Sequence, residues 1–318
     1  MLNVTLLGTS GMMPLKNRWL SSCLLNTNGH SVLVDCGEGT QIAMKCAGVR
    51  FKPIDIICIT HFHADHISGL PGFLLTLCSE GRTEPVTIIG PAGLSRVVRA
   101  LCMIAPNLTY ELRCVEYSPN EDQSLCTDSL RITPFPVRHG VPCLGYRFDM
   151  DRAGKFDPEL ASRNNVPLKL WSTLQKKGAT EYEGKLYTPD MVMGPPRKGL
   201  RVTYTTDTRP TDRIVQNAAD SDLFICEGMF SEPDKLARAL ETKHMIFQEA
   251  ALLAKRANVR RLWLTHYSPS LAVPEEGLSA ATEIYPAAEC GYDGKTIDLQ
   301  FDSGAGEPPV PISRGQNI

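Results

Sequence analysis

Potential metal ligands crowd into one short segment of this 318-residue chain. His61, His63, Asp65 and His66 fall within six residues. Imidazole and carboxylate groups are the ligands that suit Zn²⁺ and similar divalent ions. Because packing does not explain three histidines and an aspartate so close together, we favour a metal centre over a surface loop that is merely rich in histidine.

The spacing of these ligands allows two ions. His61 and His63 alternate by one residue in a loop, so both can reach one ion, whereas the adjacent Asp65 and His66 can turn towards a second. Two ions about 3.5–4 Å apart form the usual arrangement for two-metal hydrolysis. Further histidines stand beside turn-forming or strand-ending residues in separate segments, namely His139, His244 and His266. Each of these is a candidate for the same centre.

Composition limits the class of protein. The 33 basic and 35 acidic residues exclude a uniformly basic nucleic-acid binder, although a local basic patch stays open. Eleven cysteines without a C-x-x-C pair indicate free thiols in a reducing compartment. We find neither an apolar run of membrane-spanning length nor a signal peptide at the start of the chain, and therefore expect a cytoplasmic protein.

Short β-branched runs alternate with helix-like segments, which is typical of a layered α/β fold. We expect strands at residues 4–7, 32–34, 56–60, 86–89, 112–116, 130–133, 144–148, 202–206, 223–226 and 262–265. We expect helices at residues 41–47, 70–79, 94–104 and 247–257. At this length the chain can bury a large core as one domain or two.

Four of the expected strands end directly before a potential ligand or acid. These residues are His61, Asp207, Glu227 and His266. Open α/β sheets place their sites at the carboxyl ends of strands, where loops leave the sheet and side chains converge. We therefore predict that the four side chains share one rim. Taken alone, Asp207 could equally serve as a turn residue or a helix cap.

Residues 152–201 differ from the rest of the chain. This stretch is polar and holds ten basic against five acidic residues, which is the strongest local charge bias that we find. It could be an arm that follows phosphates, with an affinity that falls steeply with salt, or a solvated loop that keeps the protein soluble. Trp171 and Tyr182 could stack on bases or anchor the stretch on the body. We expect residues 303–318 to form a mobile tail.

These motifs together resemble a known family. The pattern H-x-H-x-D-H at residues 61–66 is the hallmark of the metallo-β-lactamase superfamily. The segment at residues 35–41, Asp-Cys-Gly-Glu-Gly-Thr-Gln, resembles the ribonuclease Z branch of that superfamily, whose members are endonucleases that trim tRNA 3′ ends. The resemblance implies an α/β fold, namely the four-layer αββα sandwich of the metallo-β-lactamase type. It also implies a single such domain over residues 1–302, a basic arm inserted at about 152–201, and a homodimer.

The resemblance implies roles for single residues as well. One Zn²⁺ would be held by His61, His63 and His139 and the other by Asp65, His66 and His266, with Asp207 as the bridge between the two ions. Mn²⁺ and Fe²⁺ accept the same ligands. In the family, a loop histidine and a neighbouring glutamate are associated with protonation of the departing ribose oxygen, and here they map onto His244 and Glu227. With Asp65, these are the implied catalytic residues, and a tRNA precursor is the implied substrate.

Without the resemblance, Glu227 could be a buried salt-bridge partner and His244 a helix cap. The chain also departs from the family pattern at three places. Cys226 replaces the usual histidine before the glutamate, Met245 and Ile246 replace the usual Ser-Thr after the loop histidine, and the usual Gly-Pro motif of the arm is missing from residues 166–171. A small-substrate phosphodiesterase or another hydrolase of the superfamily is therefore the alternative function. A non-catalytic RNA-binding protein ranks last, because no ligand is lost.

Overall fold

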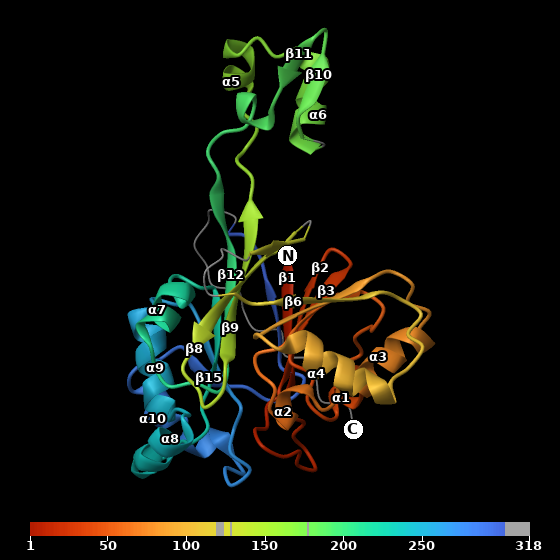
Figure 1. Ribbon diagram of the computed structural model, residues 1–318. Helices are drawn as coiled ribbons and strands as arrows, with labels where there is room; N and C mark the ends of the chain where they lie inside the picture. The colour runs from red at the N-terminus through yellow and green to blue at the C-terminus, as the bar shows by residue number, and fades with distance from the viewer. Residues whose placement is uncertain (119–123, 128, 177, 303–318) are drawn as a thin grey trace. The chain divides into compact units, whose positions relative to one another are not determined.

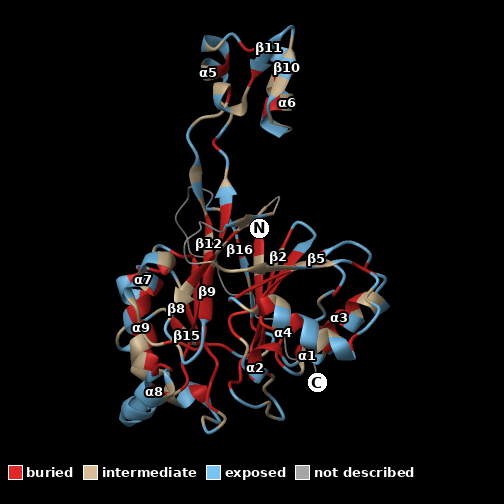
Figure 2. Cartoon of the chain, viewed as in Figure 1, coloured by how far each residue is buried: buried red, intermediate tan, exposed pale blue. Residues whose placement is uncertain are grey.

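Two sheets of apolar strands hold many of the buried side chains (Figure 2). The computed structural model describes residues 1–118, 124–127, 129–176 and 178–302. In this part of the chain, the first sheet contains β1 (Leu2–Gly8), β2 (Ser22–Thr27), β3 (His30–Val34), β4 (Ile54–Cys58), β5 (Val86–Gly90), β6 (Leu112–Glu116) and β16 (Thr296–Leu299). Its order is β16-β1-β2-β3-β4-β5-β6. The pairs from β3 to β6 are parallel, and the other pairs are antiparallel.

The second sheet contains β7 (Leu125–Cys126), β8 (Arg131–Val137), β9 (Cys143–Arg152), β12 (Arg197–Thr205), β13 (Leu223–Glu227), β14 (Leu262–Thr265) and β15 (Ala288–Cys290). Its order among the described residues is β15-β14-β13-β12-β9-β8-β7. The strands from β12 to β15 run parallel, so their carboxyl ends meet at one edge. This edge is where loops can bring polar side chains together.

Helices cover the outer face of each sheet (Figure 1). Beside the first sheet lie α1 (Thr40–Cys46), α2 (Ala64–Ile67), α3 (Leu70–Ser79), α4 (Leu94–Leu101) and η1 (Cys102–Ile104). Beside the second lie α7 (Asp212–Ala218), α8 (Leu236–Thr242), α9 (Phe247–Arg256) and α10 (Ser279–Thr282), with the short turns η4 (Pro233–Lys235) and η5 (Pro274–Gly277). The layers follow the order helix, sheet, sheet, helix. The αββα sandwich predicted from the sequence is therefore confirmed.

Apolar periodicity explains why the helices lie where they do. Leu70, Phe73, Leu74 and Leu77 of α3 recur at helical spacing, and all are buried in the core of the first half. The alanine-rich face of α9 is likewise buried in the core of the second half. None of the helices in the described residues could cross a membrane, because each is too short or too polar.

Several strand ends differ from the sequence prediction by one to five residues. β4 ends at Cys58 rather than at residue 60, because the backbone N–H of Thr60 turns from the sheet to the Asp35 carboxylate at 2.8 Å. β12 ends one residue early, at Thr205, and β13 runs one residue further, to Glu227. β2 was not expected at all, because its polar ends, Ser22 and Thr27, hide a short apolar centre.

A second compact unit is formed by Asp151–Gly199 together with residues 300–302 of the described chain, while Met1–Met150 and Leu200–Leu299 form the main unit. The second unit contains α5 (Pro158–Arg163), η2 (Leu168–Leu170), α6 (Trp171–Lys176), β10 (Thr180–Tyr182), β11 (Lys185–Tyr187) and η3 (Pro189–Met191). β10 and β11 pair as an antiparallel hairpin. The expected tail at residues 303–318 lies outside the described residues.

The second unit has a small core of its own, which its polar sequence did not predict. Leu170, Leu174 and Tyr187 are among its buried members. Trp171 packs against this core, with its indole N–H donating to the Val166 carbonyl at 3.0 Å. Trp171 therefore anchors the internal packing of this unit.

Candidate metal centre

The predicted ligands gather where loops leave strands of both sheets. His61 and His63 follow β4 of the first sheet, whereas Asp207 follows β12 of the second. The remaining members come from α2, from the turn between β8 and β9, and from the end of β14, and they are Asp65, His66, His139 and His266. The single rim expected from the strand endings therefore exists, but it is built from two facing sheets.

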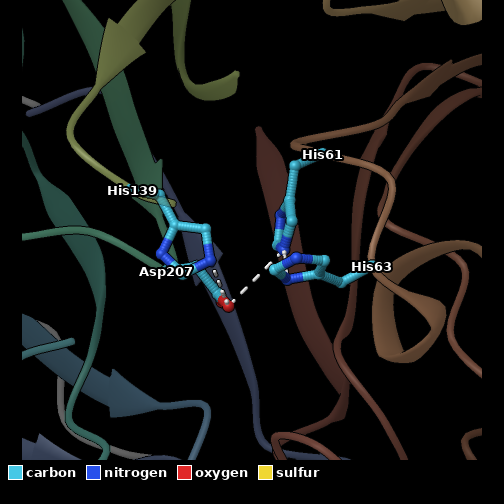
Figure 3. A group of neighbouring side chains, drawn as sticks. All are labelled: His61, His63, His139 and Asp207. Atoms are coloured by element: carbon cyan, nitrogen blue, oxygen red, sulfur yellow. Dashed lines mark hydrogen bonds and ion pairs between the residues drawn. The ribbon is translucent and has the colours of Figure 1, made fainter. Parts of the chain in front are cut away.

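One group of ligand atoms consists of His61, His63, His139 and Asp207 (Figure 3), whose atoms all lie within 4.8 Å of one another. His61 Nε2 and His63 Nδ1 are 2.9 Å apart. Asp207 Oδ2 lies 3.5 Å from His61 Nε2 and 3.7 Å from His139 Nε2. Three imidazoles and one carboxylate oxygen thus face a common point.

A second group consists of Asp65, His66 and His266. The Nε2 atoms of His66 and His266 lie 3.2 Å apart, and Asp65 Oδ2 is 3.3 Å from His266 Nε2. Asp207 Oδ1 lies 3.2 Å from His66 Nε2 and 3.0 Å from His266 Nε2. Asp207 therefore directs one carboxylate oxygen to each group.

These donor atoms are better suited to binding cations than to forming hydrogen bonds with one another. Two imidazole nitrogens that face each other form a hydrogen bond only when one of them carries a proton, whereas both can bind a cation through their lone pairs. Among the described residues, His139 Nε2 is buried without a hydrogen-bond partner. Burial, reinforced by the nearby His66, lowers the pKa of His61 to about 2, so its ring is neutral, as a ligand must be. This histidine–aspartate cluster can bind divalent metal ions.

Asp35 supports the cluster from behind, although sequence analysis gave it no role. It is fully buried, and its Oδ2 lies 2.7 Å from His66 Nδ1. The backbone N–H of Thr60 donates to Asp35 Oδ1 at 2.8 Å. A carboxylate that accepts from one ring nitrogen leaves the other free to bind a metal. The sequence contained a signal for this role, because Asp35 directly follows β3, just as His266 directly follows β14.

Glu227 and His244 form a buried pair next to the ligands. His244 Nδ1 lies 3.0 Å from Glu227 Oε2, and His244 Nε2 lies 4.0 Å from Asp207 Oδ2. Burial alone would lower the pKa of His244, but the charge and hydrogen bond of Glu227 outweigh it and raise the pKa to about 9. His244 is not a helix cap, because the N-cap of α9 is Ile246.

The cluster opens into a pocket of about 370 Å³. Its walls include His63, His139, His244 and His266, together with Met12 and Lys243. The backbone N–H of Met12 donates to Asp65 Oδ2 at 2.7 Å, so the loop after β1 holds one side of the pocket. A small ligand in the pocket can therefore reach members of both ligand groups and His244.

This fold and this metal-binding cluster define a hydrolase of the metallo-β-lactamase superfamily. Residues 190–267 match the family described as "Beta-lactamase superfamily domain", and residues 2–102 match "Anti-Pycsar protein Apyc1". Among solved structures, the short form of human tRNase Z superposes with a TM-score of 0.68 at 23% identity, covering 94% of this chain and 100% of the human chain. At that identity the likeness concerns the fold.

Curated relatives define the family within the superfamily. Ribonuclease Z of Agathobacter rectalis is 55% identical over 302 residues, which are 95% of this chain and 99% of the relative. Ribonuclease Z of Clostridium acetobutylicum is 46% identical, covering 95% of this chain and 100% of the relative. The chain belongs to the ribonuclease Z family, and the resemblance noted in the sequence is confirmed.

Proposed function

We propose that the chain is a metal-dependent endoribonuclease that hydrolyses a phosphodiester to remove the 3′ trailer of tRNA precursors in the cytoplasm. The observation that carries this proposal is the 55% identity to a ribonuclease Z over 95% of the chain. The site agrees with it, because the ligand cluster and the Glu227–His244 pair open into one pocket.

The cluster is proposed to hold two Zn²⁺ ions. The ligands of one would be His61, His63 and His139 and those of the other Asp65, His66 and His266, with Asp207 shared between them. Divalent ions held there supply Lewis acidity, which lowers the pKa of water and neutralises charge on the phosphodiester. The two oxygens of Asp207, each directed at one group, support the bridging role.

The departing ribose oxygen needs a proton, because an alkoxide is a poor leaving group. We assign this step to His244, which lines the pocket and whose Nδ1 is held by Glu227. Glu227 stabilises the protonated ring and also accepts backbone N–H groups from Thr208 and Met245, which fix the carboxylate in place. Asp65 contributes as a ligand, held by the Met12 N–H.

We assign binding of the RNA to a basic arm. We propose one metallo-β-lactamase-like domain over residues 1–302 with this arm inserted at about 152–201. Several of its basic side chains are exposed, namely Lys155, Arg163, Lys169, Lys176, Lys185 and Lys198. Lys169 lies over the Tyr182 ring, 3.7 Å from its centroid, so Tyr182 is partly covered by a cation. A homodimer, which the resemblance implies, is part of the proposal, and the mass of the protein in solution tests it.

The decisive assay offers two substrates at several salt concentrations. Purified protein is incubated with a trailer-bearing tRNA precursor and with bis(4-nitrophenyl) phosphate. We expect cleavage of both, with the apparent affinity for RNA falling as salt rises, because phosphate contacts release counterions. Cleavage of the small diester alone would support a small-substrate phosphodiesterase. Binding of RNA without cleavage of either substrate would support a non-catalytic RNA-binding protein.

A further inference from the structure

Arg209 joins three segments behind the pocket. Its guanidinium forms a two-pronged ion pair with Glu249, in which Nη1 donates to Oε2 at 2.9 Å and Nη2 donates to Oε1. Nη1 also donates to the backbone carbonyl of His244 at 2.5 Å. The side chains of Arg209 and Glu249 are only 12% and 17% exposed. Because paired guanidinium and carboxylate groups prefer this geometry, the contact is well defined.

Glu249 extends the network into the start of α9. It is the third residue of the helix, and its Oε2 accepts the backbone N–H of Ile246 at 3.2 Å. Met245 and Ile246 have no side-chain oxygen that could accept a backbone N–H at the helix start. Glu249 therefore supplies the half of a capping box in which the N3 carboxylate accepts the N-cap N–H, and Ile246 has no hydroxyl to supply the other half.

The same loop carries His244. Arg209 holds the carbonyl of His244, Glu249 holds the N–H two residues later, and Glu227 holds the N–H of Met245 between them. The backbone of Arg209 is itself fixed, since its N–H donates to the Arg138 carbonyl at 2.8 Å. Two backbone groups of this short loop, the carbonyl of His244 and the N–H of Ile246, are therefore attached to the Arg209–Glu249 ion pair.

We propose that Arg209 and Glu249 are a positioning pair that aims the His244 imidazole at the departing oxygen. This proposal rests on the proposed function, in which His244 is the proton donor. The pair acts through His244 and not on the substrate: in the described chain, neither Arg209 nor Glu249 lines the pocket. Their loss disturbs proton delivery and leaves the ligand cluster intact.

The test compares leaving groups in single and double variants. R209A and E249Q are measured beside H244A, R209A/H244A and the control R256A. Arg256 lies on α9, as Glu249 does, and pairs with Asp212 at 2.6 Å, but that pair is exposed on the surface. Substrates are a tRNA precursor, whose ribose oxygen needs a proton, and bis(4-nitrophenyl) phosphate, whose nitrophenolate needs little. Bound metal and melting temperature are recorded for every variant.

We expect R209A to lower kcat on the tRNA precursor about 10- to 100-fold, a part of what a general acid contributes. E249Q, which keeps an acceptor for Ile246, should lose less. Turnover of the nitrophenyl diester, KM for RNA and metal content should stay within about twofold, the range of sites outside the reaction. R256A should match the wild type. R209A/H244A should be no slower than H244A, because a residue that acts through another adds nothing once that other is gone.

The outcomes separate the two proposals. If H244A slows both substrates equally, His244 is not the acid, and the proposed function fails at that step together with this inference. If H244A is selective but R209A slows both substrates, or neither, only the positioning inference is overturned. A raised KM for RNA in R209A, persisting in the H244A background, would assign Arg209 to RNA binding instead. If the melting temperature falls in R209A alone, the inference is decided by comparing the two substrates in E249Q, which should slow tRNA cleavage and spare the nitrophenyl diester.

Discussion

Replacing Asp35 with Asn changes the oxygen that faces both His66 Nδ1 and the Thr60 hydroxyl. Asn keeps an oxygen for the Thr60 N–H, and it tolerates the left-handed backbone at this position, where φ is 57°. Opposite His66 Nδ1, however, the carboxylate Oδ2 at 2.7 Å becomes an amide N–H₂, which can only donate. His66 Nδ1 must then accept, so its proton moves to Nε2, the atom that faces Asp207 and His266.

A protonated Nε2 cannot bind a metal, so the variant can bind the metal only when His66 adopts its less stable tautomer. Loss of such an outer partner costs about 10- to 100-fold in metal affinity, or about 1.4–2.7 kcal/mol. Asp55→Asn is the matched control, because Asp55 Oδ2 lies 2.5 Å from His30 Nδ1 outside the metal centre. This control should bind metal as the wild type does.

The assay is competition for Zn²⁺ against a chelator of known affinity, with circular dichroism to show that both variants are folded. Hydrolysis of the nitrophenyl diester at limiting zinc should fall in parallel with metal affinity and recover as zinc is added. An Asp35→Asn protein that binds zinc as tightly as the Asp55→Asn control would refute the tautomer reasoning.

Three further outcomes are expected. Asp207→Ala should remove hydrolysis of both the tRNA precursor and the small diester and lower the metal content, measured by elemental analysis; unchanged turnover with full metal would exclude the bridging role. Glu227→Gln removes the charge that raises the pKa of His244. Because the acid must stay protonated, the alkaline limb of the kcat–pH profile on the tRNA precursor should move to lower pH than in the wild type; an alkaline limb that does not move contradicts this. Deleting residues 169–185 should weaken tRNA binding in a filter assay and spare the small diester, and unaffected tRNA cleavage would reject the arm.

Local patterns predicted much of the fold. Apolar runs located β4, β5 and β14, and helical spacing located α3, because burying one face of each segment leaves a period in the sequence. The short elements escaped prediction. β10 and β11 have three residues each, too few for a period, and the core of the second unit is assembled from single side chains along a polar stretch.

The ligand types and the positions of His61, His63, Asp65 and His66 were fixed by the chain itself, because neighbours in sequence are neighbours in space. The order of polar residues after strands also marked Asp207 and His266 as candidates. Tertiary structure alone decided that two sheets face each other and bring these ends within 4.8 Å. It also decided the roles of the buried Asp35 and the largely covered Arg209, because such polar groups are stable only where distant segments supply their hydrogen-bond partners. No local pattern records such long-range pairing, since its energy comes from contacts that exist only in the folded protein.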